Sequence, residues 1–203
     1  LVRERQISFQ YLPEEVFKPF AGKNHQGVLA EVSPIPYQDI NMIVDAVLSE
    51  GKAPLILILD RITDVRNFGG IARTAECAGV DAILIPNKNS AKISSDAIKT
   101  SAGALYHLPV CREKNLKKTI KELKRKGLQL FAATEKADKF YTDAEMKEGC
   151  MIMLGAEDTG ITEDLLVLAN QQIKIPQFGQ IESLNVSAAA AILMYEAVRQ
   201  RRE

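Results

Sequence analysis

Strand-length runs of apolar residues recur along most of this chain and alternate with segments of helical spacing. Residues 55–60 (LILILD) form a continuous apolar run, which is typical of a parallel strand buried on both faces. Further strands are predicted from similar but shorter runs, at residues 81–86, 108–111, 128–133, 151–154 and 173–175. The alternation of strands and helices predicts an α/β fold built on a parallel sheet.

Helices are expected between these strands. Apolar residues at helical spacing over residues 39–49, ended by Gly51, predict the first one. Residues 61–70 are interpreted as a loop that contains Gly69 and Gly70. The remaining helices are expected at residues 71–78, 94–101, 113–126 and 187–198. The helix at 113–126 is amphipathic, and we interpret its many lysines as a solvated face rather than an RNA contact.

The first 36 residues have a different character. A strand is expected at residues 7–12 and a short helix at 13–20, before a linker marked by glycines and prolines. His25 is interpreted as structural, because no nucleophile accompanies it in the sequence. The chain begins Leu-Val-Arg-Glu-Arg, with neither methionine nor a signal-like segment, so we expect a piece of a longer protein.

Composition narrows the functional classes. The 203 residues, 46% of them hydrophobic, can bury one domain or one domain plus a fragment. With 26 basic and 26 acidic residues the net charge is zero, so any surface for nucleic acid must be local. Cys77, Cys111 and Cys150 form no CxxC pair, which predicts neither a metal site nor a disulfide framework. No apolar run is long enough for a membrane span, so we expect a cytoplasmic protein.

Candidate chemistry gathers after two of the expected strands. Ser183, Asn185 and Ser187 stand at alternate positions directly before a helix-forming run of four alanines. One of them is explained as a helix cap, but three suggest a site as well. The second group is the stretch 155–161 (GAEDTGI), where glycines let the backbone approach a ligand. A dinucleotide-binding oxidoreductase is disfavoured, because the glycines around residue 70 do not have GxGxxG spacing.

Three stretches together resemble the motifs of the SpoU branch of the SPOUT RNA methyltransferases. They are residues 60–86 (DRITDVRNFGGIARTAECAGVDAILIP), 155–161, and 175–202 (IPQFGQIESLNVSAAAAILMYEAVRQRR). The likeness covers roughly residues 55–202, and all three motifs occur in order. Residues 24–28 (NHQGV) extend it, since they resemble the domain junction of SpoU enzymes that act on guanosine in ribosomal RNA.

The resemblance carries expectations about fold and assembly. It implies a C-terminal deep trefoil knot, although knots are very rare among protein folds in general. Residues 1–36 would be the remnant of a substrate-binding domain like ribosomal protein L30e plus a linker, and residues 37–203 the methyltransferase domain. It also implies a homodimer whose active site is built at the subunit interface.

The resemblance further implies an activity and a set of residues. The expected reaction is methyl transfer from S-adenosylmethionine to a ribose 2′-hydroxyl, with S-adenosylhomocysteine as product and no metal. The cofactor pocket is expected to contain Thr134, Gly155, Gly160, Ile175 and Leu184. The expected catalytic residues are Asn67, Arg73, Glu157, Ser183 and Asn185.

Roles for the catalytic residues follow partly from chemistry. A guanidinium does not readily lose its proton in a protein, so we expect Arg73 to act as a fixed positive charge that holds a phosphate and stabilises the developing alkoxide. Its small and apolar neighbours predict a packed or functional place for it. Asn67, Ser183 and Asn185 would orient the hydroxyl and Arg73, and Glu157 would hold the ribose or Arg73.

The expected substrate is a guanosine in large-subunit ribosomal RNA, with transfer RNA as the alternative. A non-catalytic RNA-binding relative would lack one of Asn67, Arg73 or Asn185, and all three are present. Because the net charge is zero, we expect phosphate contacts to rest on a few local residues such as Arg61, Arg66 and Arg73.

Overall fold

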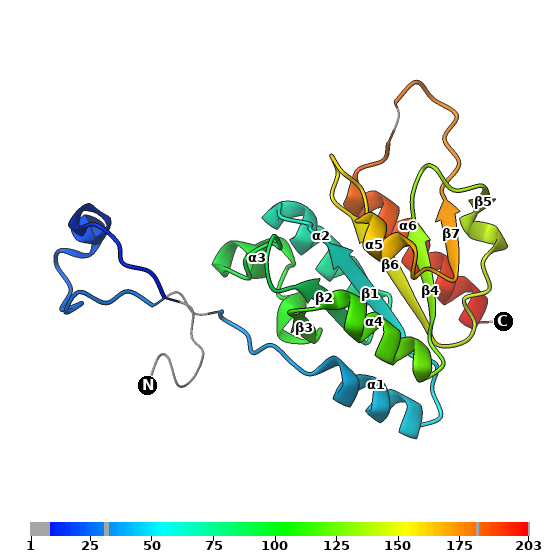
Figure 1. The fold of residues 1–203 in the computed structure, drawn as a ribbon, viewed down its shortest axis with the longest axis horizontal. Coiled ribbons are helices and arrows are strands. Elements are labelled where there is room, and N and C mark those ends of the chain that lie inside the picture. The colour runs from blue at the N-terminus through cyan, green and yellow to red at the C-terminus, as the bar shows by residue number, and fades with distance from the viewer. Residues whose placement is uncertain (1–8, 31–32, 182, 203) are drawn as a thin grey trace. The chain divides into compact units, whose positions relative to one another are not determined.

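The structure, a computed structural model, describes residues 9–30, 33–181 and 183–202 (Figure 1). The chain divides into two compact units, Leu1–Val32 and Ser33–Glu203. The division falls close to the domain boundary expected after residue 36. That the first unit is the remnant of an L30e-like domain stays a prediction.

Among residues 9–30, the first unit contains one element, the 3₁₀ helix η1 (Glu14–Phe20), which follows Pro13 and has two glutamates in its first turn. The strand expected at residues 7–12 is wrong over residues 9–12, which are irregular, and the rest of it lies outside the described residues. No strand is described among residues 9–30, so residues 9–12 have no strand to pair with in that range. The Nδ1 atom of His25 accepts a hydrogen bond from the Gly27 amide (3.0 Å), and its ring lies 5.0 Å from that of Phe17. Both contacts fit a structural role.

The second unit is built on a seven-stranded sheet, and every strand pair in it is parallel, which confirms the predicted α/β class. Strand β1 (Leu55–Asp60) is an interior strand of this sheet and is buried at every position, as its continuous apolar sequence predicts. Strand β5 has only two residues and was not expected. In spatial order the strands are β3 (Val110–Glu113), β2 (Ala82–Pro86), β1 (Leu55–Asp60), β6 (Cys150–Gly155), β4 (Gln129–Ala133), β7 (Gln171–Lys174) and β5 (Lys139–Phe140).

Helices cover both faces of the sheet and form two separate apolar clusters with it (Figure 1). One face carries α2 (Val65–Cys77), α3 (Ser95–Thr100) and α6 (Val186–Arg201). The other carries α1 (Ile40–Ser49), α4 (Leu116–Arg125) and the short α5 (Glu163–Leu166). The 3₁₀ helices η2 (Ala104–Tyr106) and η3 (Tyr141–Asp143) complete the described elements of this unit.

Helix α2 begins six residues earlier than expected, so the loop predicted over residues 61–70 is largely wrong. Asp64 caps the helix by accepting a hydrogen bond from the Asn67 amide (2.7 Å). Gly69 and Gly70 therefore lie inside the helix. A Cβ atom on Gly69 would come within 2.6 Å of Cβ of Thr100 in α3. The glycine thus serves close packing between two helices rather than a turn.

Three further expectations concern the knot, the membrane span and the lysine-rich helix. The trefoil knot stays a prediction. None of the described helices is both long and apolar enough to cross a membrane. Two lysines of this region engage partners within the fold, since Lys117 of α4 pairs with Asp164, and Lys126, which follows the last residue of α4, pairs with Asp45. This supports the solvated-face interpretation of that helix.

Candidate functional site

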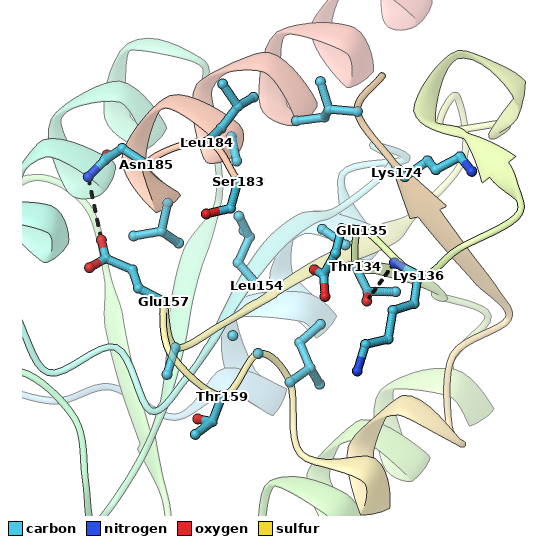
Figure 2. Close-up of a pocket in the computed structure, with 18 of the residues that line it drawn as sticks. Thr134, Glu135, Lys136, Leu154, Glu157, Thr159, Lys174, Ser183, Leu184 and Asn185 are labelled. Carbon is cyan, nitrogen blue, oxygen red and sulfur yellow. Dashed lines mark hydrogen bonds between the residues drawn. The ribbon is translucent and has the colours of Figure 1, made fainter. Parts of the chain in front are cut away.

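A cavity of about 610 Å³ lies at the carboxyl ends of β4, β6 and β7, where helix α6 begins (Figure 2). This is the edge at which parallel α/β sheets bind ligands. Its apolar lining comes from Ala133, Leu154, Ala156, Ile161, Leu166, Ile173, Ile175, Leu184, Val186 and Ala189, with Gly155 and Gly160. Its polar lining comes from Thr134, Glu135, Lys136, Glu157, Asp158, Thr159, Lys174, Gln177, Ser183 and Asn185. We call this space the first cavity.

Every residue expected in the cofactor pocket lines the first cavity. These residues are Thr134, Gly155, Gly160, Ile175 and Leu184. The sequence interpretation missed several polar neighbours, namely Glu135, Lys136, Asp158, Thr159 and Lys174. A signal for them existed, because four of them lie within five residues after the end of a predicted strand and Lys174 lies inside one. Polar residues at the carboxyl ends of adjacent parallel strands meet at one edge of the sheet.

A second cavity of about 420 Å³ adjoins the first at the carboxyl end of β1 and the start of α2. Its own lining residues are Arg61, Ile62, Thr63, Asp64, Asn67 and Asn89. Ala156, Glu157, Asp158, Thr159 and Val186 line both cavities. The loop after β6 therefore forms a wall between two spaces, each of a size suited to a small molecule or nucleotide.

Asn67, Glu157 and Asn185 meet in this wall, although they come from three distant parts of the sequence. The Nδ2 group of Asn67 donates to Oε1 of Glu157. The Nδ2 group of Asn185 donates to Oδ1 of Asn67 (3.0 Å) and to Oε1 of Glu157 (3.4 Å), the latter marked in Figure 2. We call these three residues the Asn–Glu–Asn cluster.

The orientation of the cluster is set by the start of helix α6. Oδ1 of Asn185 accepts hydrogen bonds from the amide (2.9 Å) and the hydroxyl (2.6 Å) of Ser187. Its Nδ2 group must then point toward Asn67 and Glu157. Both of these hydrogen bonds to Glu157 end on Oε1, so Oε2 keeps its capacity to accept a hydrogen bond from a ligand.

The other two expected catalytic residues are placed differently. Ser183 lines the first cavity, on the loop between β7 and α6. Arg73 lines neither cavity and is exposed on α2, so of the packed or functional place predicted from its neighbours the packed one is wrong and the functional one stays a prediction. Ile71, Ala72 and Ala75 are buried on the other side of the helix. Six residues turn a helix by about 600°, which places Arg73 about 120° around the helix axis from Asn67, on a different face.

Comparison with known proteins gives consistent results. A profile described as the SpoU rRNA Methylase family matches residues 54–195. The chain is 34% identical over 201 residues to a Staphylococcus haemolyticus protein described as a TrmH family tRNA/rRNA methyltransferase, covering 99% of this chain and 81% of that protein.

Solved structures agree with these matches. One is an RNA 2′-O ribose methyltransferase (TM-score 0.68, 30% identity, 87% of this chain and 61% of that chain). Another is an AdoMet-bound rRNA methyltransferase from Sinorhizobium meliloti (TM-score 0.68, 28% identity, 72% of this chain and 56% of that chain). The chain thus spans about three fifths of the length of these two solved chains.

Proposed function

We propose a function that starts from one premise: the chain belongs to the SpoU rRNA methylase family. In this proposal the protein is an RNA methyltransferase that uses S-adenosylmethionine and acts on a ribose 2′-hydroxyl. The observation that carries this proposal is the Asn–Glu–Asn cluster, set in the wall between two adjoining cavities. The first cavity takes the cofactor, and the second takes the acceptor nucleotide.

The residues of the first cavity fit S-adenosylmethionine. Leucine, isoleucine and valine side chains line it, as the flat apolar faces of an adenine require. Glu135 and Asp158 can accept hydrogen bonds from ribose hydroxyls or an ammonium group, and Lys136 and Lys174 can pair with a carboxylate. Gly155 lets the backbone line the cavity without a side chain. When bound, the cofactor supplies an activated methyl group on a sulfonium centre.

The cluster supplies alignment and a proton acceptor. A ribose hydroxyl is a weak nucleophile at neutral pH, so its proton must be held or removed during attack. Oε2 of Glu157 is the carboxylate oxygen free to accept that hydrogen bond, while Oε1 is fixed by the two asparagines. In this arrangement Asn67 and Asn185 hold the carboxylate in place rather than react themselves. Ser183 lines the first cavity and orients the groups bound there.

Arg73 serves the neighbouring active site of a homodimer in this proposal. Exposed apolar side chains on α6 and on the loop before it support contact with a second copy, with Phe178 96% exposed and Tyr195 of α6 49% exposed. Arg73 is exposed, so its guanidinium is accessible to a partner subunit. The partner's Arg73 would then provide the positive charge that stabilises developing negative charge on the attacking oxygen.

The RNA is a guanosine-containing segment of large-subunit ribosomal RNA in this proposal. Support comes from the resemblance of residues 24–28 to the junction of ribosomal-RNA enzymes. Transfer RNA is the second candidate, because the curated relative is described as acting on tRNA or rRNA. Mapping 2′-O-methyl sites in total RNA, with and without the gene, separates the two. The absence of any lost 2′-O-methyl site would overturn the proposed reaction.

The shared active site can be tested with mixed dimers. Arg73→Ala and Glu157→Gln should each lower the methyl-transfer rate of a homodimer by about a hundredfold. In a purified heterodimer of the two variants, one site carries both substitutions and the other carries neither, provided that Arg73 acts across the interface. About half of the wild-type activity should then return. The matched controls are the two variant homodimers, and a heterodimer as inactive as these controls would place Arg73 in the site of its own chain.

A further inference from the structure

The wall between the two cavities is a tightly folded loop, residues 156–162, whose shape depends on backbone contacts. The Gly160 amide donates to the Ala156 carbonyl (2.8 Å), and these two residues form an isolated antiparallel bridge. Glu157, Asp158 and Thr159 lie at the tip between them and line both cavities. Whatever fixes this loop therefore sets the geometry of both cavities at once.

Asp60, the last residue of β1, ties the far end of this loop to the sheet. It is only 3% exposed, which is rare for an aspartate unless its charge is paired. Its Oδ2 atom accepts hydrogen bonds from both the amide (2.8 Å) and the hydroxyl of Thr162. The same oxygen lies 3.4 Å from Nε of Arg61. Asp60 lines neither cavity, so its contacts serve the loop rather than a ligand.

Arg61 also holds the loop, and its backbone has an unusual conformation. Its φ angle is 60°, in the left-handed region that residues other than glycine rarely adopt. This conformation directs the guanidinium back over the loop, where Nη2 donates to the Gly160 carbonyl (3.0 Å). The loop is thus held at Thr162 by Asp60 and at Gly160 by Arg61, and the two holding residues are paired with each other.

We propose that Asp60 and Arg61 are positioning residues for methyl transfer, which hold loop 156–162 so that Glu157 stays in the Asn–Glu–Asn cluster and the cofactor cavity keeps its wall. The proposal rests on the proposed function for the identity of the ligands. It differs from the expectation that Arg61 serves mainly as a contact for an RNA phosphate. A phosphate contact affects RNA binding alone, whereas a loop anchor also affects the cofactor, in a cavity that Arg61 does not line.

The test measures cofactor affinity after removal of the anchor. Arg61→Asn is the suitable variant, because asparagine tolerates the left-handed backbone while the guanidinium is lost. Calorimetry with S-adenosylhomocysteine should give a Kd about tenfold higher than that of the wild type, equivalent to about 1.4 kcal/mol. Hydrogen exchange should speed up at the amides of residues 156–162. Asp60→Asn, which retains an acceptor for Thr162 but loses the charge, should change both quantities in the same direction.

The matched control is Arg112→Asn. Arg112 also donates from Nη2 to a backbone carbonyl, that of Asn87 (2.8 Å), but it lines neither cavity. Its substitution should leave the cofactor affinity unchanged. Thermal unfolding of each variant shows that the binding assay is made on folded protein, and Arg61→Asn alone decides the question if Asp60→Asn does not fold.

Two outcomes separate this inference from the proposed function. If Arg61→Asn keeps the wild-type affinity for S-adenosylhomocysteine while its KM for RNA rises, Arg61 is a phosphate contact and the anchoring role is wrong. If the wild-type protein itself does not bind S-adenosylhomocysteine, the proposed function fails. In that case the exchange rates of residues 156–162 still decide whether the pair anchors the loop.

Discussion

Gly155→Ala should disable the site while adding a single methyl group. Gly155 ends β6 and stands where the loop between the two cavities folds back against the strand. A Cβ atom there would lie 2.1 Å from the Gly160 carbonyl carbon, 2.2 Å from the Ile161 amide nitrogen and 2.3 Å from the Gly160 carbonyl oxygen. All three are backbone atoms, so no side-chain rotation can relieve the clash.

The size of the effect follows from these distances. Ordinary contacts of a Cβ atom begin at 3.4 Å, so the loop must move away from β6 by more than about 1 Å. Glu157 lies two residues along the chain and would move with the loop, away from Asn67 and Asn185. A misplacement of about 1 Å in a catalytic arrangement can cost about a hundredfold in rate. We therefore expect a methyl-transfer rate lower by about that factor and weaker binding of S-adenosylhomocysteine.

The assay is transfer of a labelled methyl group to an RNA fragment, alongside calorimetry of S-adenosylhomocysteine binding. Gly179→Ala is the matched control, since Gly179 lies on the neighbouring loop and a Cβ atom there would meet nothing within 4 Å. It should retain the wild-type rate and affinity. If Gly155→Ala behaves like this control, the loop accommodates the methyl group without moving Glu157, and the argument from close packing is refuted.

Two further predictions concern stability and reactivity. Arg201→Ala should lower the free energy of unfolding by about 3 kcal/mol and Tm by about 6–12 °C. The reason is that its guanidinium donates to four backbone carbonyls, those of Ala53, Pro54, Met146 and Glu148. A loss of less than about 1 kcal/mol in urea unfolding would contradict this prediction. In the native protein the exposed Cys77 should be the one thiol that reacts quickly with a thiol reagent. Cys111 and Cys150 should react slowly, because burial raises the pKa of Cys111 to about 12 and that of Cys150 to about 11. Rapid modification of two thiols would show that one of these buried sites opens readily.

The sequence predicts most of the sheet because burial on both faces leaves a direct signature in it. Residues 55–60 are apolar at every position, and β1 is buried at every position. The cavity was also accessible to prediction, since glycines and polar residues placed after strands must meet at the carboxyl edge of a parallel sheet. That Asn67, Glu157 and Asn185 would touch one another required the motif resemblance, because no local pattern links residues 118 positions apart.

The errors arose where tertiary packing overrides local preference. Gly69 and Gly70 favour a loop on propensity alone, yet α2 runs through them because Asp64 caps the helix and Gly69 leaves room for Thr100. Because the helix was predicted only from residue 71, the sequence interpretation also placed Arg73 incorrectly. Its buried neighbours Ile71, Ala72 and Ala75 lie on the inner side of α2, and they indicate an amphipathic helix rather than a buried arginine.

The charges around the second cavity give the exposed position of Arg73 a physical meaning. Three carboxylates line that cavity, those of Asp64, Glu157 and Asp158, against one cation, Arg61. Arg61 is already engaged with Asp60 and the Gly160 carbonyl. Because the carboxylates outnumber this one engaged cation, the lining disfavours an RNA phosphate and offers little positive charge to a developing alkoxide. If the acceptor nucleotide binds there, as we propose, a further cation must come from outside the cavity. In the proposed homodimer, the partner's Arg73 would supply that cation.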